Sequence, residues 1–292
     1  MDLADLNVIK NLCKKYGLRP SKDFSQNFLI DREVLDEIVA AADLKKNDVV
    51  LEIGPGLGVL TAELAERVSR VIAVEADRNM AKVLSEIMTD FPNVEIIQED
   101  VLKFPISNFQ FTNKILNQKS QIKNYEYKVV ANLPYQITSA VFRKFLSEEP
   151  RPSEITVMVQ KEVAERISAK PGEMSLLSLS VQFFGQPEIT AVVPRAAFWP
   201  EPKVDSAILR VTRIKNESEK NLKRIDSEKF FKVVKIGFSA RRKQLHNNLS
   251  GGLRIPDQKV KEILVSLGFD ERARAQDLGI NDWIELVNQL NS

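Results

Sequence analysis

Glycines and acidic residues follow successive β-branched runs of this chain, where buried strands are expected to end. The run 49–53 is followed by Gly54 and Gly56, whose missing Cβ atoms let a bound ligand approach the backbone closely. The next two runs end at Glu75 and Asp100. A carboxylate at the first position can accept both hydroxyls of a ribose, as acidic residues do in dinucleotide folds. A carboxylate at the second can accept a hydrogen bond from the exocyclic amine of a base.

This glycine-rich turn differs from the known phosphate-binding motifs. It is not the GxGxxG fingerprint, and it lacks the Lys-Ser/Thr pair of a P-loop. Taken singly, the turn also suits an ordinary strand-to-helix connection, and each acid suits a solvated loop. Because the three features stand at three successive strand ends, together they favour an adenosine-containing ligand without a phosphate. The natural candidate for such a ligand is S-adenosylmethionine.

The fourth run, 128–131, is followed by Asn132-Leu133-Pro134-Tyr135, which suits a reaction at an exocyclic amine. The N6 amine of adenine is a poor nucleophile because its lone pair is delocalised into the ring. The Asn132 side-chain oxygen and a backbone carbonyl of Leu133 or Pro134 can accept the two amine hydrogens and favour a pyramidal nitrogen. Pro134 stiffens the turn, and Tyr135 can stack on the base for about 1–3 kcal/mol. The alternative is an Asn-Pro turn beside a core tyrosine.

Composition excludes several other classes of protein. Of the 292 residues, 43% are hydrophobic and 28% are charged, which is ordinary for a globular protein and rules out a collagenous or largely disordered chain. No run approaches the ~18 apolar residues of a membrane span, and the acidic start has no apolar signal segment. Cys13 and His246 are the only residues of their types, which excludes an internal disulfide and Cys- or His-based metal clusters. We therefore expect a cytoplasmic protein without a structural metal or a membrane partner.

Charge is unevenly distributed along the chain. Residues 211–292 carry a net charge of +5, whereas residues 1–210 carry −3. The segment 229–261 holds nine basic residues and one acid, and the leader 1–22 adds five basic residues. Basic segments of this kind favour binding to a polyanion, because neutralised phosphates release their counterions. A solvated helix face is the alternative reading of the same charges.

The elements that must position these residues alternate between strands and helices. Strands are expected at 49–53, 70–75, 94–98, 128–131 and 155–159, and helices after Asp31, at 57–68, at 78–88 and from 162 onward. This alternation predicts a parallel α/β sheet with buried strands. Two later β-rich segments, near 181–193 and 206–211, are expected to complete the sheet, one of them as an antiparallel strand.

The rest of the chain is predicted to form loops and a small helical domain. The polar stretch 107–124 has the composition of a surface loop, and 215–223 that of a linker. Helices are expected at 230–249, 257–267 and 282–290, with a break at Gly251-Gly252.

Further segments are similar to the small-subunit (16S) ribosomal RNA adenine N6,N6-dimethyltransferases, and Asn-Leu-Pro-Tyr itself resembles the adenine-N6 methyltransferases. The similar segments are 25–29, 160–166, 198–206 and 238–243. Members of that family methylate two adjacent adenosines near the 3′ end of the rRNA, twice each. The resemblance implies an α/β fold with a Rossmann-like, class I S-adenosylmethionine-dependent methyltransferase sheet in residues 1–214, including a basic leader 1–24. It also implies a small helical RNA-binding domain in residues 215–292.

The resemblance also implies roles for individual residues. The cofactor would be held by Asn27, Leu29, Gly54, Gly56, Glu75, Asp100 and Asn132, the first two closing over its methionine end. Phe198 would face Tyr135 across a flipped-out base, and Arg241, Arg242 and Lys243 would lie against rRNA phosphates. The sequence departs from the family at Ser25, where glycine is usual, and near 171–177, where a Tyr-Gly pair is missing.

Two other functions fit part of the same pattern. One is the related methylation of a large-subunit rRNA adenine by resistance enzymes, whose tract corresponding to 198–206 differs. The other is a non-catalytic RNA-binding factor for ribosome assembly or transcription, against which the intact Asn132-Pro134-Tyr135 set argues. The expected partner is the small ribosomal subunit with its 16S rRNA, and the expected state is a monomer.

Overall fold

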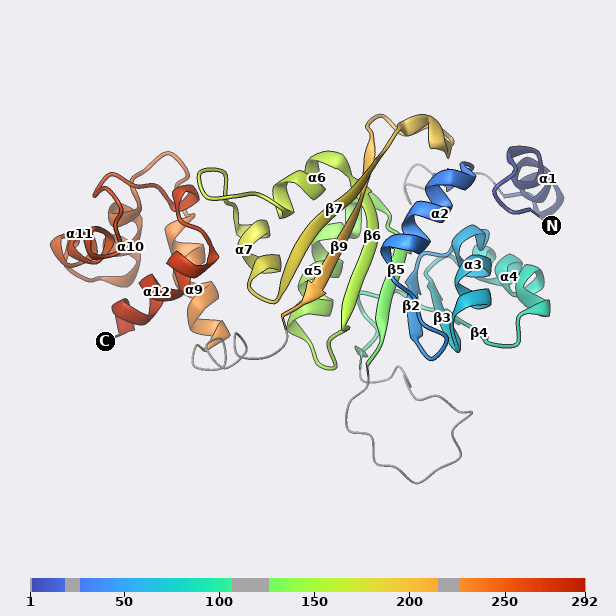
Figure 1. Ribbon diagram of the computed structural model, residues 1–292, viewed down its shortest axis with the longest axis horizontal. Coiled ribbons are helices and arrows are strands. Elements are labelled where there is room, and N and C mark those ends of the chain that lie inside the picture. Colours follow the sequence, from blue (N-terminus) through green and yellow to red (C-terminus); the bar gives the residue numbers. More distant parts are fainter. Residues whose placement is uncertain (1, 19–26, 107–125, 215–225, 292) are drawn as a thin grey trace, which may run out of the picture. The chain divides into compact units, whose positions relative to one another are not determined.

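The computed structural model describes residues 2–18, 27–106, 126–214 and 226–291. The chain divides into two compact units, one made of Met1–Ala164 with Glu188–Thr212 and the other of Glu165–Pro187 with Arg213–Ser292 (Figure 1). The domain boundary expected at residue 214 lies close to the observed one between Thr212 and Arg213. Residues 165–187, however, which we had expected in the first domain, join the C-terminal helices. The reason is apolar packing, since the Phe183 ring lies 4.4 Å from that of Phe230 between centroids.

A seven-stranded sheet runs through the first unit. Its strands are β2 (Val49–Ile53), β3 (Arg70–Glu75), β4 (Val94–Gln98), β5 (Lys128–Asn132), β6 (Glu154–Gln160), β7 (Gly185–Val193) and β9 (Ser206–Arg213). They lie in the order β4-β3-β2-β5-β6-β9-β7. The first five are mutually parallel, and β9 runs antiparallel to β6. The predicted parallel α/β sheet and its antiparallel strand are thus confirmed.

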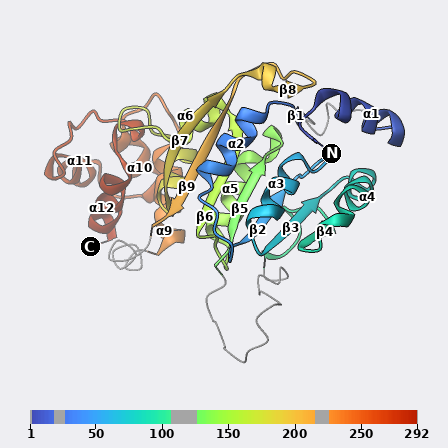
Figure 2. The same ribbon diagram turned by 45° about the vertical axis from the view of Figure 1, so that its right-hand side comes forward.

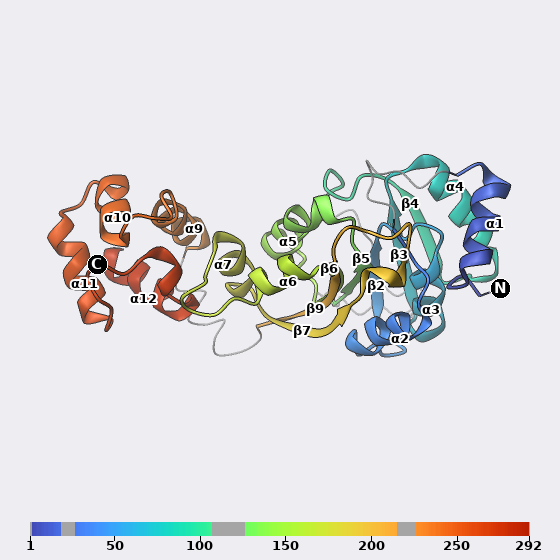
Figure 3. The same ribbon diagram turned by 90° about the horizontal axis from the view of Figure 1, so that it is seen from above.

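Helices cover both faces of this sheet. They include α2 (Arg32–Ala41), α3 (Val59–Arg67), α4 (Arg78–Ile87), α5 (Thr138–Ser147) and α6 (Lys161–Ile167). Helices α2 and α3 lie on one face, and α5 lies on the other (Figure 3). The helix expected after Asp31 is confirmed, and the Asp31 carboxylate caps it by accepting hydrogen bonds from the backbone N–H groups of Glu33 and Val34. None of the described helices is long and apolar enough to cross a lipid bilayer.

The N-terminal segment contains structure that the sequence analysis missed. Helix α1 (Leu6–Tyr16) buries Ile9, Leu12 and Cys13 within the core of the first unit and leaves its lysines exposed. The short strands β1 (Phe28–Leu29) and β8 (Phe198–Trp199) pair with each other in a separate two-stranded sheet (Figure 2). Two-residue strands carry no recognisable periodicity, so only the pairing reveals them.

The second unit is helical, as predicted, but its elements differ from the expected ones. It contains α7 (Leu176–Gln182), α9 (Ser227–Gly237), α10 (Leu245–Leu253), α11 (Asp257–Ser266) and α12 (Ile280–Asn291). The expected single helix over 230–249 is wrong, because a turn at 238–244 separates α9 from α10. The expectation of a strand beginning at Val181 is also wrong, since this residue lies in α7, which a Ser175–Ser178 capping box starts.

Gly251 and Gly252 do not break a helix, contrary to the prediction. Both lie inside α10, which ends only at Leu253. A Cβ on Gly252 would lie 2.3 Å from Cγ2 of Ile236 on α9. The glycine is therefore explained by close helix packing rather than by a turn. The predicted loop 107–124 and linker 215–223 lie outside the described residues.

Candidate active site

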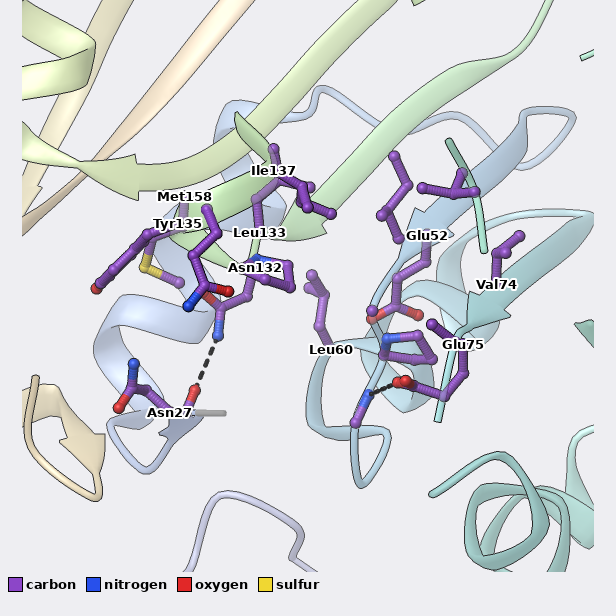
Figure 4. Close-up of a pocket in the computed structure, with 18 of the residues that line it drawn as sticks. Asn27, Glu52, Leu60, Val74, Glu75, Asn132, Leu133, Tyr135, Ile137 and Met158 are labelled. Atoms are coloured by element: carbon purple, nitrogen blue, oxygen red, sulfur yellow. Dashed lines mark hydrogen bonds between the residues drawn. The ribbon is translucent and has the colours of Figure 1, made fainter. Parts of the chain in front are cut away.

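A cavity of about 270 Å³ opens at the carboxyl ends of strands β2, β3, β4 and β5 (Figure 4). The strand order reverses between β2 and β5, and ligands of open α/β sheets bind beside such a switch point. Ten of the predicted site residues line this cavity. They are Asn27, Leu29, Gly54, Gly56, Glu75, Asp100, Asn132, Leu133, Pro134 and Tyr135.

The two glycines after β2 bring other parts of the site together. Gly54 and Gly56 have φ values of +67° and +59°, which residues with side chains rarely adopt. A Cβ on Gly54 would lie 3.4 Å from the Pro134 ring, and one on Gly56 would lie 3.4 Å from the Phe28 ring. The turn therefore packs directly against the Asn-Leu-Pro-Tyr segment and against strand β1. This explains the glycines by their protein neighbours as well as by space for a ligand.

Glu75 lies at the end of β3 with both carboxylate oxygens engaged by backbone donors. Oε1 accepts from the Asp77 N–H at 2.9 Å, and Oε2 accepts from the Gly56 N–H at 3.3 Å. Burial raises the pKa of this carboxyl, and the hydrogen bonds oppose that rise. Each oxygen retains capacity to accept one more hydrogen bond. The arrangement suits a carboxylate that binds a diol.

Asp100 follows β4 at the rim of the same cavity. Its Oδ1 accepts from the Leu102 N–H at 3.0 Å, and its Oδ2 lies 3.4 Å from the Lys103 ammonium. The backbone contact holds the carboxyl in a tight turn while leaving it partly exposed. It can accept a further hydrogen bond from a ligand.

The Asn132 side chain is oriented by a hydrogen bond to the segment before β1. Its Nδ2 donates to the Asn27 carbonyl at 3.2 Å, as the dashed line in Figure 4 marks. The side-chain oxygen Oδ1 accepts no hydrogen bond from the described residues. Because the amide nitrogen is held by a carbonyl, the oxygen is the end of the amide that remains for a ligand.

The structure distinguishes the two backbone carbonyls proposed as the second acceptor. The Pro134 carbonyl accepts from the Ile137 N–H at 3.1 Å in a short 3₁₀ turn. The Leu133 N–H donates to Met158 at 3.1 Å, and the Leu133 carbonyl accepts nothing from the described residues. The two acceptors that receive no hydrogen bond from any described residue are therefore the Asn132 side-chain oxygen and the Leu133 carbonyl.

Tyr135 is half-buried at the mouth of the cavity, and its hydroxyl is fixed. It lies 2.7 Å from Oγ of Ser206, the first residue of β9. Burial raises the pKa of the phenol. This contact limits rotation of the ring and makes Ser206 a positioning residue, which a sequence pattern does not reveal because the partners are 71 positions apart.

Phe198 is not brought to the cavity. Its side chain is 2% exposed and belongs to the core of the first unit, and its backbone pairs with Leu29 across β1 and β8. The neighbouring Trp199 stacks on Phe28, whose ring lines the cavity. The expected contact of Phe198 with a base opposite Tyr135 stays a prediction.

Glu52 lines the cavity although the sequence analysis did not select it. Its side chain is 1% exposed, and burial raises its pKa to about 8. The signal was present in the sequence, because an acid interrupts the otherwise apolar strand 49–53. A carboxyl inside a continuously buried strand requires an explanation.

The predicted RNA-contacting residues lie in the second unit. Arg241, Arg242 and Lys243 occupy the turn between α9 and α10, and all three are exposed. Within the described part of the chain their side chains form no ion pair or hydrogen bond. Among the residues that the structure describes, no group of three His, Cys, Asp or Glu side chains could hold a metal ion.

A protein-family model described as ribosomal RNA adenine dimethylase matches residues 17–292. The chain belongs to this family. It is 44% identical over 277 residues to Ribosomal RNA small subunit methyltransferase A of Dehalococcoides mccartyi (strain BAV1), an alignment that covers 95% of this chain and 90% of the relative. It is 36% identical to the protein of the same name from Clostridioides difficile (strain 630), covering 99% and 97%. The resemblance seen in the sequence is thereby confirmed, and the chain is an rRNA methyltransferase.

Solved structures agree with this family. The crystal structure of a dimethyladenosine transferase from Plasmodium falciparum matches with a TM-score of 0.74 and 26% identity, covering 90% of this chain and 97% of that one. The crystal structure of the 23S rRNA methyltransferase ErmE matches with a TM-score of 0.68 and 29% identity, covering 91% and 100%. The predicted class I methyltransferase fold is confirmed.

Proposed function

We propose that this protein transfers methyl groups from S-adenosylmethionine to N6 of two adjacent adenosines near the 3′ end of 16S rRNA, producing N6,N6-dimethyladenosines during small-subunit assembly. The observation that carries the proposal is the pair of acceptors at the mouth of the cavity. The Asn132 side-chain oxygen and the Leu133 carbonyl both remain available, and together they match the two hydrogens of an exocyclic amine.

The cavity residues fit the proposed donor. S-adenosylmethionine supplies an electrophilic methyl group on a positively charged sulfur. Glu75 suits the ribose hydroxyls, Asp100 suits the adenine amine, and among the described residues that line the cavity the Asp and Glu side chains occur without any Lys or Arg. Acidic surroundings favour a cationic ligand over an anionic one. The cofactor-binding roles of these residues are part of the proposal.

The chain's own residues would then activate the target amine without a strong base. Accepting both amine hydrogens draws the nitrogen out of conjugation and exposes its lone pair. Tyr135, held by Ser206 at 2.7 Å, offers a face on which the target base can stack. The nitrogen becomes acidic only after it gains the methyl group, so its proton can pass to water. This agrees with a cavity lined by no histidine among the described residues.

The small subunit is favoured as substrate by the names of the relatives, which act on small-subunit rRNA and share 36–44% of their residues with this chain over nearly its full length. The second candidate is a large-subunit rRNA adenine. Its support is the structural similarity to ErmE, a 23S rRNA methyltransferase. Exposed basic residues at 241–243 suit the phosphates of either RNA.

The test is methyl transfer from radiolabelled S-adenosylmethionine to unmethylated small subunits and, in parallel, to large subunits. After nuclease digestion, we expect label in N6,N6-dimethyladenosine from the small subunit only. Asn132→Ala is expected to lose turnover while still binding the cofactor. Asn47→Ala, an exposed asparagine before the amino end of β2, is the matched control and should retain turnover. Label only in large subunits would refute the proposed substrate, and binding of RNA without label would favour a non-catalytic assembly factor.

A further inference from the structure

The turn that presents Arg241, Arg242 and Lys243 is a strongly charged feature of the second unit. It connects α9 with α10 over residues 238–244, and no acid occurs within it. All three cationic side chains are exposed. Adjacent like charges repel one another, so these side chains do not themselves stabilise the turn. The contacts that fix its backbone therefore come from other residues.

The side chain of Asn248 reaches this turn from α10. It is 7% exposed. Its Nδ2 donates to the carbonyl of Gly237, the last residue of α9, at 2.6 Å and to the carbonyl of Ala240 at 3.2 Å. Ala240 directly precedes Arg241. Because an amide nitrogen carries two hydrogens, both are used, and the side chain joins the end of α9 to the middle of the turn.

The carbonyl of Ala240 is also the point at which the turn closes on itself. It accepts a hydrogen bond from the Lys243 N–H at 3.0 Å. The same oxygen thus receives one hydrogen bond from within the turn and one from α10. The start of the turn is fixed by close packing, since a Cβ on Gly237 would lie 2.4 Å from the Trp283 ring of α12. Asn248 therefore connects a fixed helix end to the closing point of the turn.

The amide of Asn248 occupies a position that an apolar residue could fill. It is buried on the same helix as Leu245 and Leu249, which are both fully buried, and burial of a polar group costs free energy unless the group is bonded. A cap of α9 would require only the bond to Gly237, because a helix leaves its last carbonyls without partners. The second bond, to Ala240, is directed at the cationic turn. A satisfied buried polar group specifies one arrangement of the backbone around it.

We propose, on the basis of the function proposed above, that Asn248 is a positioning residue for rRNA binding. It holds the turn 238–244 in the conformation that presents Arg241, Arg242 and Lys243 to RNA phosphates. A turn that is ordered before binding loses less conformational entropy when the RNA docks. Phosphate contacts fix the position of an RNA without reading its sequence. Asn248 therefore acts on RNA affinity and leaves the chemistry at the cavity of the first unit unchanged.

The principal variant is Asn248→Leu, which keeps the approximate size of the side chain and removes its hydrogen-bond donors. We expect the slope of log affinity for small-subunit rRNA against log salt concentration to fall by about one to two, because the cationic contacts lose their order. At about 0.1 M salt, the loss of one such contact corresponds to roughly tenfold weaker binding. The KM for small subunits should rise, whereas kcat and the affinity for S-adenosylmethionine should stay as in the wild type. Asn247→Leu makes the same substitution at the exposed neighbouring residue and is the matched control, with slope and KM unchanged.

A double-mutant cycle separates positioning of the turn from a general loosening of the second unit. In a protein that already carries Arg241→Ala, Arg242→Ala and Lys243→Ala, the further change Asn248→Leu should weaken RNA binding little, because the cations that it orders are gone. A general loosening would weaken binding by a similar factor in both backgrounds, and that result would overturn the inference. The fluorescence of Trp283, which is fully buried in the second unit, verifies that each variant is folded.

Hydrogen exchange of the wild type tests the same inference without any variant. The Lys243 amide, which donates to the Ala240 carbonyl, should exchange more slowly in the free full-length protein than in an unstructured peptide. Exchange at the unstructured rate, or an unchanged salt slope and KM in folded Asn248→Leu, would overturn the inference and leave the proposed function intact. Absence of methyl transfer by the wild type would overturn the proposed function, whereas the RNA-binding measurements would still decide the role of Asn248.

Discussion

Replacing Glu52 with glutamine should stabilise the ligand-free protein, and by an amount that grows with pH. Glutamine has the same shape as the protonated acid and no proton to lose. The wild-type carboxyl has an ordinary pKa of 4.5 when unfolded and about 8 when folded, because burial disfavours its charged form. Between these values the folded state binds more protons than the unfolded state. The contribution of the Glu52 carboxyl to the stability of the folded state is therefore fully present below pH 4.5, and it is lost as the pH rises toward 8.

The size of the effect follows from the two pKa values. One pH unit between them corresponds to about 1.4 kcal/mol. Glu52 alone should lower the free energy of unfolding of the wild type by about 3 kcal/mol between pH 4.5 and 7, and by about 4 kcal/mol between pH 4.5 and 8. The Glu52→Gln protein lacks this dependence, so the difference between the two proteins should widen by these amounts.

Urea denaturation of both proteins at several pH values between 5 and 8 measures the difference directly. Trp199 in the first unit and Trp283 in the second report the two transitions by fluorescence, and the expected change belongs to the first. Glu99→Gln serves as control, because it makes the same substitution at an exposed residue of the same cavity. A difference in unfolding free energy that stays constant across this pH range would refute the assignment of Glu52 as a buried, protonated acid.

Three further outcomes are expected. Glu75→Ala should weaken cofactor binding in calorimetry by tenfold or more, because two acceptor oxygens are lost; unchanged affinity would remove the ribose role. Replacing both Arg241 and Arg242 with alanine should reduce by about two the slope of log affinity for rRNA against log salt concentration. An unchanged slope would show that these arginines form a solvated surface and do not contact RNA phosphates. Gly252→Ala should cost about 1–3 kcal/mol of stability in urea denaturation, since its Cβ would lie 2.3 Å from a side-chain atom of α9. Gly251→Ala meets nothing within 4 Å and should be neutral or stabilising by up to about 1 kcal/mol; equal effects of the two changes would contradict the packing explanation.

Local sequence patterns were sufficient to predict the strand ends and helix starts that depend only on neighbouring residues. The strand ends at Ile53 and Glu75 were predicted at the observed residues, because a buried parallel strand is a continuous apolar run that stops where its backbone leaves the sheet. The start of α2 after Asp31 was equally visible, since a helix start depends on neighbouring residues. Parallel strands with crossover helices then place their carboxyl ends at one edge. For that reason the sequence already grouped Gly54, Glu75 and Asn132 into one site.

Packing between distant segments decided which side chains and carbonyls of the site are available, fixed or buried. The choice of the Leu133 carbonyl over that of Pro134, the fixing of Tyr135 by Ser206 and the burial of Phe198 depend on contacts between residues far apart in the chain or on the exact turn that the backbone adopts. Glycine is typical of helix ends, but Gly252 lies inside α10, where α9 packs closely against it.

The sequence by itself determined the sheet, the position of its functional edge and the family of the protein, because apolar periodicity and short motifs are properties of neighbouring residues. Only the tertiary structure decided which groups at that edge are satisfied and which remain available. Glu52 shows why: its identity is plain in the sequence, but its burial and the lack of a hydrogen bond to its Oε2 from any described residue depend on the elements that pack around the cavity.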